Sequence, residues 1–216
     1  AQNKADEVIP RLQELADKDA VNSTLQYFLA EQLVKADRLA DAEALYKKTI
    51  EATKDSSGYA GLAGVYRRLG KAEDLLQALE KAIGAARGND DVEENLGALE
   101  VELKAISQDE KLMEAMIAAG RRGATADPVM LDFAGSLILA KLAATVKNTE
   151  AVVEFYRFAL KARRDRASLI FEELGQYLLL NNEYVESAKV FQEAASDPAL
   201  DKQRPNFLFR LSQAYA

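Results

Sequence analysis

The sequence contains no cysteine, no histidine and no tryptophan. Without cysteine there is no disulfide and no thiol nucleophile, and without cysteine and histidine together the usual zinc sites cannot form. The absence of histidine also removes the imidazole group that most often acts as a general base. A lack of cysteine is compatible with any compartment, so the sequence does not fix one; a soluble, cytoplasmic setting is the expectation.

Residues that interrupt helices are also sparse, with four prolines and eleven glycines among 216 residues. No stretch approaches the ~20 apolar residues of a membrane-spanning helix, and the first ten residues lack the basic and apolar regions of a signal peptide. The net charge of −7 is opposite to the basic surface that nucleic-acid binding normally requires. We therefore expect neither membrane insertion nor nucleic-acid binding.

The chain is rich in alanine, leucine, glutamate and lysine, which are the strongest helix formers. Residues 57–83 show how they are arranged, because apolar residues recur at helical spacing before Leu69-Gly70-Lys71 and again after it. Gly70 suits the left-handed position that ends a first helix and lets the chain reverse. The small Ala63 would let a second helix approach closely. This segment therefore predicts a helical hairpin.

Small residues recur along the chain at a nearly constant interval. The intervals are 33, 34, 43, 35 and 37 residues for Ala30, Ala63, Gly97, Ala140, Gly175 and Ser212. Only the interval that crosses residues 121–127 departs strongly. A period near 34 with helix–turn–helix units is the signature of tetratricopeptide repeats.

The chain resembles the tetratricopeptide repeat (TPR) family over almost its whole length. The residues that match the family pattern in order are Leu62, Ala63, Tyr66, Gly70 and Ala82, and then Leu174, Gly175, Tyr184, Phe191 and Ala194. The resemblance implies an all-α fold, a right-handed α-solenoid of antiparallel helix hairpins that forms one domain over residues 1–216. The expected units are a half repeat at 4–18, repeats at about 23–55, 56–87, 90–120, 128–164 and 168–196, and a half repeat at 205–216.

The two terminal half repeats match the second and the first helix of a repeat, respectively. We therefore expect the chain to be part of a longer protein. In that case the apolar faces around Val8 and Ile9, and around Phe207 and Leu211, would be exposed. Such faces could pair between molecules and form a homo-oligomer.

Two pairs of residues have the spacing of a capping box at a helix start. Ser23 is followed by Gln26, and Asp90 is followed by Glu93. In a capping box the first side chain accepts from the backbone of the third residue on, and the later side chain bonds back. Both sites therefore predict a helix start.

Residues 120–127 contain two glycines before an Asp-Pro step and predict a loop. Asp127 would cap the following helix, with Pro128 as its first residue. The unit at 90–125 departs from the family pattern, since Glu100 stands where a large apolar residue is usual. Other helical hairpins, such as Sel1-like or HEAT repeats, could account for this middle part.

In this family the first helix of each hairpin lines a concave surface, so the resemblance implies a groove. The groove candidates are Tyr27, Glu31, Lys35, Arg67, Arg68, Lys141, Glu172 and Gln176, together with Leu137, Phe209 and Gln213. We interpret them as a surface for an extended or helical segment of a protein partner, with Arg67 and Arg68 meeting carboxylates. The plain alternative is that these are solvated side chains on ordinary helices.

The family's Lys, Asn and Arg clamp for a C-terminal carboxylate is not expected here. Tyr27, Glu31 and Ala60 fall at positions where such residues would stand. A role in binding chaperone tails through that clamp is therefore not predicted.

The basic clusters are Arg121-Arg122 and residues 161–166. They could hold phosphate or an acidic partner, but basic residues in a last helical turn more often complement the helix dipole, which is the preferred interpretation. The acidic run at 89–94 lacks the spacing and central glycine of a calcium loop, so we expect no metal. Glu172 and Glu173 are adjacent, and their carboxylates cannot share one helix face for acid–base work.

No glycine-rich phosphate loop, serine elbow or kinase-like residue set is present. We therefore expect no enzyme and no cofactor, and we interpret the chain as a protein–protein interaction scaffold. One alternative is a structural spacer or self-assembly module that pairs through its terminal helices. A more distant one is a carboxylate-based hydrolase or lyase on a helical toroid.

Overall fold

The computed structural model describes residues 2–85 and 99–215, and within these ranges it contains twelve α-helices, two short 3-10 helices and no strand. The all-α class predicted from the sequence is confirmed. The chain divides into two compact units, Ala1–Ala119 and Gly120–Ala216, and each is described by itself. Within the described ranges, no helix has the length and apolar character needed to cross a membrane.

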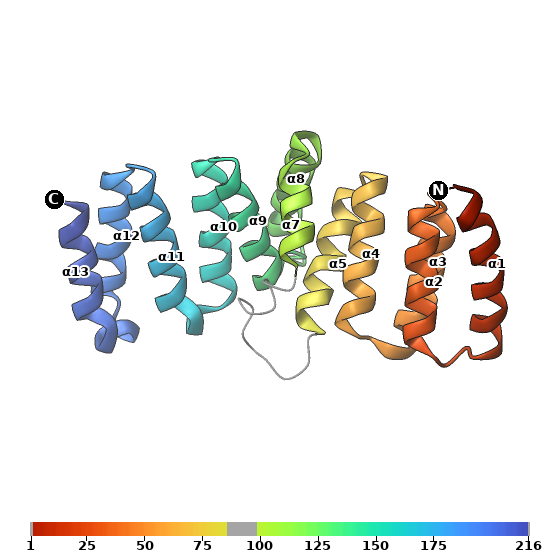
Figure 1. The fold of residues 1–216 in the computed structure, drawn as a ribbon. Coiled ribbons are helices and arrows are strands. Elements are labelled where there is room, and N and C mark those ends of the chain that lie inside the picture. The colour runs from red at the N-terminus through yellow and green to blue at the C-terminus, as the bar shows by residue number, and fades with distance from the viewer. Residues whose placement is uncertain (1, 86–98, 216) are drawn as a thin grey trace. The chain divides into compact units, whose positions relative to one another are not determined.

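Unit 1 is built from helices that pack in pairs (Figure 1). Its helices are α1 (Gln2–Lys18), α2 (Ser23–Lys35), α3 (Leu39–Thr53), α4 (Ser56–Leu69), α5 (Ala72–Gly84), α7 (Glu100–Ser107) and the start of α8 (Glu110–Thr125). Helix α2 packs against α3 and α4 against α5, while α3 also contacts α4 and α1 packs on α2. Each hairpin therefore contacts its neighbour in sequence.

Unit 2 begins with the last part of α8 and repeats this arrangement. Its helices are α9 (Phe133–Thr145), α10 (Thr149–Ala162), α11 (Ala167–Leu180), α12 (Tyr184–Ser196) and α13 (Arg204–Ala214), with 3-10 helices η1 (Arg164–Arg166) and η2 (Pro198–Gln203). Helices α9 and α10 form one hairpin and α11 and α12 the next, while α10 contacts α11 and α13 packs on α12 (Figure 1). The division of the whole chain into one solenoid with the repeat boundaries given above stays a prediction.

The turns inside four hairpins share one backbone geometry. Each contains a residue with positive φ, namely Asp37, Gly70, Lys147 and Asn182. The residue after it donates its backbone N–H to a carbonyl in the preceding helix, from Arg38 to Leu33, Lys71 to Tyr66, Asn148 to Ala143 and Glu183 to Leu178, over N···O distances of 2.9–3.0 Å. This is the bond that closes a Schellman ending. The turn predicted at Gly70 is confirmed.

The recurring small residues mark where helices approach closely. Ala30, Ala63 and Ala140 are fully buried. Gly175 is buried as well, and a Cβ at that position would lie only 2.5 Å from Phe191 Cζ. Ser212 departs from the series because it is exposed, and Gly97 lies outside the described residues. The period read from the sequence therefore reflects packing at four of its six positions.

The capping box predicted at Ser23 is wrong. Helix α2 is capped by Asn22, whose side chain accepts a hydrogen bond from the Leu25 backbone N–H over 3.1 Å. The Gln26 side chain is buried and donates instead to the Ala16 carbonyl of α1 over 2.8 Å. Gln26 therefore joins two helices rather than closing the start of one. The second predicted box, at Asp90 and Glu93, lies outside the described residues.

The loop predicted at residues 120–127 is also wrong for most of its length, because α8 continues to Thr125. A Cβ on Gly120 would overlap Leu139 Cδ1, and a Cβ on Gly123 would lie 3.3 Å from the Leu131 backbone nitrogen. Both glycines thus serve close packing. Helix α9 begins at Phe133 with Asp132 as its cap, so the predicted start with Asp127 as cap and Pro128 as first residue is a further error.

Candidate functional site

In unit 1 the predicted groove residues on α2 do not all face solvent. The Tyr27 ring stacks on the Tyr46 ring with centroids 5.8 Å apart, and its hydroxyl shares a hydrogen bond with Thr53 Oγ1 at 2.8 Å. Partial burial is the main cause that raises the pKa of Tyr27 above its usual value. Glu31 and Lys35 are exposed. Tyr27 therefore supports the hairpin, while Glu31 and Lys35 lie at the surface.

The two arginines of α4 are both engaged by neighbouring elements. Arg67 Nε donates to Glu102 Oε2 of α7 over 2.7 Å. Arg68 donates to Asp37 Oδ1 over 2.8 Å and also contacts the Val34 carbonyl oxygen. These guanidinium groups therefore link consecutive hairpins, and a partner carboxylate would compete with those partners.

In unit 2 the predicted residues of α9 and α11 form equivalent links. Lys141 Nζ lies 3.0 Å from Glu173 Oε1, and Glu172 Oε1 accepts from Arg210 Nε of α13 over 2.7 Å. The adjacent carboxylates of Glu172 and Glu173 thus turn to different helices, in accordance with their spacing. Gln176 is exposed and makes no hydrogen bond through its side chain within the described ranges.

Of the three remaining groove candidates, Leu137 is only 1% exposed and belongs to the core. Its expected position at the surface is therefore wrong, since α9 is buried over nearly all its length. Phe209 and Gln213 are exposed on α13. Gln213 accepts a 3.2 Å hydrogen bond from Arg210 Nη1, so it touches the same ion pair as Glu172.

We call Arg67–Glu102, Lys141–Glu173 and Glu172–Arg210 the first-helix ion pairs. Their partners are separated by 35, 32 and 38 residues, which is close to the repeat period. Glu102, Glu173 and Arg210 were missed among the sequence candidates. A search for opposite charges one repeat apart would have found them, because equivalent positions of consecutive first helices lie side by side.

A cavity of about 610 Å³ lies on this face of unit 2, between α11 and α13. Its lining combines charged, amide, hydroxyl and apolar side chains. They are Asp165, Arg166, Ser168, Leu169, Glu172, Gln203, Asn206, Phe207, Phe209 and Arg210. Of the groove candidates predicted from the sequence, Glu172 and Phe209 line it.

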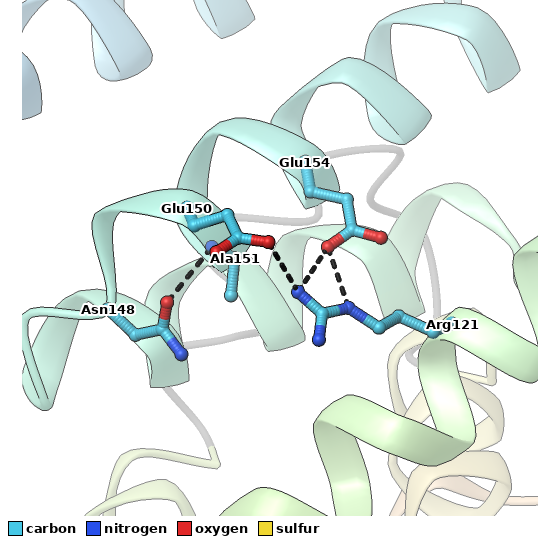
Figure 2. A network of polar contacts seen from close by, with 5 residues as sticks. All are labelled: Arg121, Asn148, Glu150, Ala151 and Glu154. Carbon is cyan, nitrogen blue, oxygen red and sulfur yellow. Dashed lines mark hydrogen bonds and ion pairs between the residues drawn. The ribbon is translucent and has the colours of Figure 1, made fainter.

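The second helices of unit 2 are joined in the same manner, as Figure 2 shows for Arg121 of α8. Arg121 Nη2 lies 2.7 Å from Glu154 Oε2 and 3.5 Å from Glu150 Oε1 of α10. The hydrogen bond to Glu154 is the main cause that raises the pKa of Arg121. Asn148 caps α10 by accepting from the Ala151 backbone N–H over 3.1 Å. The interpretation of Arg121 as a complement to its own helix dipole is therefore replaced by an ion pair between helices.

The arginines of the basic run at 161–166 pair with nearby carboxylates. Arg163 donates to both Asp165 carboxylate oxygens over 2.8 and 2.9 Å, and Arg164 pairs with Asp197. The paired Arg163 lowers the pKa of Asp165 to about 2. These arginines are therefore held by side-chain carboxylates, rather than simply complementing the end of α10.

A second, smaller cavity of about 250 Å³ lies in unit 1 over α3, α4 and α5. At its edge the Lys47 and Lys71 ammonium groups lie 5.8 and 5.5 Å from the centroid of the Tyr66 ring. Glu43 holds both lysines, with Oε1 2.6 Å from Lys47 Nζ and Oε2 3.0 Å from Lys71 Nζ. The hydrogen bond from Lys47 is the main cause that lowers the pKa of Glu43.

Among the described residues, no three acidic side chains gather in a way that could hold a metal ion. The acidic run at 89–94, which was considered for a cation, lies outside those residues. The expectations of no enzyme and no cofactor stay predictions.

No family model matches the sequence, and no curated protein matches it either. The solved structures that share a likeness with it include the following three. MamA is 15% identical, with 77% of this chain and 86% of that chain covered and a TM-score of 0.39. YrrB, described as a TPR protein with an unusual peptide-binding site, is 16% identical, with 95% and 98% covered and a TM-score of 0.37. The TPR2AB domain of yeast Sti1, described in a complex with pHSP90, is 12% identical, with 98% and 92% covered and a TM-score of 0.36. The hairpins themselves, with buried small residues and left-handed turns, remain the evidence for a TPR-like fold.

Proposed function

We propose that the chain is a non-catalytic protein-interaction scaffold that binds a peptide or protein segment along the first-helix faces of its hairpins. In unit 1 this surface comprises Tyr27, Glu31, Lys35, Arg67 and Arg68, and in unit 2 it comprises Lys141, Glu172 and Gln176. The single observation that carries the proposal is the cavity of about 610 Å³ between α11 and α13. Glu172 lines this cavity, and its volume falls within the ~300–1,000 Å³ range of ligand pockets.

The surface is held in place before any partner arrives. The first-helix ion pairs fix Arg67, Lys141 and Glu172 against neighbouring helices, and the hairpins beneath them are packed on buried alanines and aromatics. A surface that is already ordered loses less conformational entropy on binding. This supports recognition of a flexible segment by a preformed groove.

The test is selection of a random 12-residue peptide library on the whole chain, followed by hydrogen-exchange mapping of any bound peptide. We expect enriched peptides to protect α9, α11 and α13, and Gln176→Ala to weaken their binding about 3-fold or more because it removes one hydrogen-bonding group. The matched control is Gln192→Ala, which changes an exposed glutamine on the second helix α12. Enriched peptides that protect only α10 and α12, or a selection without enrichment, would contradict the proposal.

A second candidate is self-assembly through terminal helices, which is favoured by the apolar side chains that these helices expose. Val8 and Leu15 on α1 are 44% and 52% exposed, and Leu208 on α13 and Tyr215 just after it are 50% and 71% exposed. The predicted exposure of Ile9 and Phe207 is wrong, because both side chains are buried in the core. Light scattering over a range of concentrations tests this function. A mass that stays monomeric at all concentrations would exclude it, whereas a mass that rises and returns to monomer in Leu208→Lys would support it.

A further inference from the structure

The charges around the cavity between α11 and α13 are already engaged with one another. Glu172 Oε1 lies 2.7 Å from Arg210 Nη2, in addition to its bond with Nε. Asp165 is held by Arg163 and lies 3.9 Å from Arg166 Nε. The four charged residues that line the cavity, Asp165, Arg166, Glu172 and Arg210, sum to zero. A charged ligand would therefore have to break an existing pair to gain a counter-ion.

The uncharged polar side chains of the cavity are, in contrast, available. Ser168, Gln203 and Asn206 line it, and within the described ranges their side chains have no hydrogen-bond partner. A carboxamide group offers both a donor and an acceptor. Asn206 and Gln203 can therefore bond to the N–H and C=O of another peptide backbone, as can the hydroxyl of Ser168.

The remaining lining is apolar. Phe207 is 2% exposed and packs against Phe171 and Phe191, with ring centroids 6.5 Å away in each case. Leu169 is half-buried, and Phe209 is 62% exposed at the cavity. A large apolar side chain placed between Leu169 and Phe209 would remove both from water, which is favourable.

We propose that this cavity binds an uncharged, extended peptide segment that carries one large apolar side chain. The apolar side chain lies against Leu169 and Phe209, and the peptide backbone bonds to Asn206 and Gln203. This inference rests on the proposed function and specifies its partner chemistry in unit 2. Because the lining charges are neutralised internally, affinity comes from apolar burial and neutral hydrogen bonds rather than from charge.

The test uses four acetylated and amidated heptapeptides, Gly-Ser-Gly-X-Gly-Ser-Gly, in which X is Phe, Leu, Glu or Lys. Binding to the whole chain is followed by chemical-shift changes of its backbone amides. We expect the Phe and Leu peptides to bind about 10-fold more tightly than the Glu and Lys peptides, the factor that burial of one large apolar side chain supplies. Affinity for the Phe peptide should change less than about 2-fold between 0.05 and 0.5 M salt, since no new ion pair forms.

Phe209→Ala and Asn206→Ala should each weaken binding of the Phe peptide about 5-fold or more. The first removes an apolar contact of the Phe side chain, and the second removes a hydrogen-bond partner of the peptide backbone. Leu208→Ala is the matched control, because Leu208 is half-exposed on the same helix and does not line the cavity. Tighter binding of the Glu or Lys peptide, equal effects of all three variants, or no binding of any peptide would overturn the proposal. So would a wild-type dimer that Phe209→Ala dissociates, since the occupant would then be a second copy.

The two proposals fail in different ways. If the random library yields peptides that map to α9, α11 and α13 but are charged at their centre, the scaffold function stands and the uncharged ligand is wrong. If the library yields no such peptide, the scaffold function itself fails.

Discussion

Gly175 and Gly120 lie where two helices approach so closely that a neighbouring side chain takes the place of a Cβ. The Phe191 ring occupies that space at Gly175, and Leu139 and Phe155 occupy it at Gly120. Gly58 and Gly61 of α4 meet Tyr27 and Tyr46 in the same way. At these positions the packing of the helices therefore requires glycine, because a larger residue would overlap the neighbouring side chain.

Gly175→Ala should destabilise the protein by about 1 kcal/mol. The new methyl group would force Phe191 aside, which costs ~1–3 kcal/mol in a well-packed core, against a gain in helix propensity of up to ~1 kcal/mol. Urea unfolding measures the difference. The matched control is Gly84→Ala on α5, where a Cβ meets nothing within 4 Å, and which should be neutral or stabilising. A Gly175→Ala variant as stable as the control would contradict the close contact between Gly175 and the Phe191 ring.

Glu43 gives a pH-dependent contribution with a defined sign. Its pKa is lowered in the folded protein by Lys47 first and Lys71 after it, so its ionised form stabilises the fold. That stabilisation is present above the unfolded pKa, near 4.5, and is lost as the pH falls through the lower folded value. Glu43→Gln should therefore reduce the unfolding free energy at pH 7. The difference in unfolding free energy between the variant and wild type should become smaller below pH 4.5.

Equilibrium unfolding of both proteins across this pH range checks the prediction. Glu51→Gln is the control on the same helix, because Glu51 is exposed and has no ion pair within the described ranges. A difference in unfolding free energy that is constant with pH, or that grows in acid, would contradict the assigned role of Glu43.

The helical hairpin is the element that the sequence predicts best, although some local sequence signals within it gave wrong predictions. Gly70 and the Asn181-Asn182 pair carry local turn chemistry, and the structure has turns there. The same residue type misleads at Gly120 and Gly123, because glycine serves turns and close packing alike and only the neighbouring helix distinguishes them. Gln26 misleads for a similar reason, since its partner is a carbonyl of α1. A sequence pattern over a few residues gives a wrong prediction where the hydrogen-bond partner lies on another helix.

The turns predict an ordered series of stability changes. Lys147 adopts φ of 55° in the α9–α10 turn, a conformation that costs a non-glycine residue ~1–2 kcal/mol. Lys147→Gly should therefore stabilise the protein by about 0.5–1 kcal/mol, less than the full strain because glycine is freer in the unfolded chain. Gly70→Ala should lose about 1 kcal/mol, and Asn182→Gly should change little because Asn tolerates this region. Thermal unfolding of the three variants gives the order, and a destabilised Lys147→Gly would contradict it.

At the scale of the whole molecule, charge is divided unevenly between the two units. Acidic residues clearly outnumber basic ones in Ala1–Ala119, whereas the two are nearly balanced in Gly120–Ala216. The acidic excess behind the net charge of −7 therefore lies in unit 1. The groove assignment stays a prediction, and the sequence did not identify Glu102, Glu173 and Arg210 as the partners of Arg67, Lys141 and Glu172. Pairing depends on which helices are neighbours, and a single helix pattern does not contain that information.

The division into units predicts how a local defect spreads. Phe191 is fully buried and contacts the Phe207 ring of α13 and the position of Gly175 on α11, so Phe191→Ala should cost about 3–5 kcal/mol. In an array where each hairpin contacts mainly its neighbours, that loss stays near its origin. Native-state hydrogen exchange should therefore show faster exchange in α11, α12 and α13, while α2 to α5 keep the protection of wild type. Equal loss of protection in both units would mean that the chain unfolds as a single cooperative body.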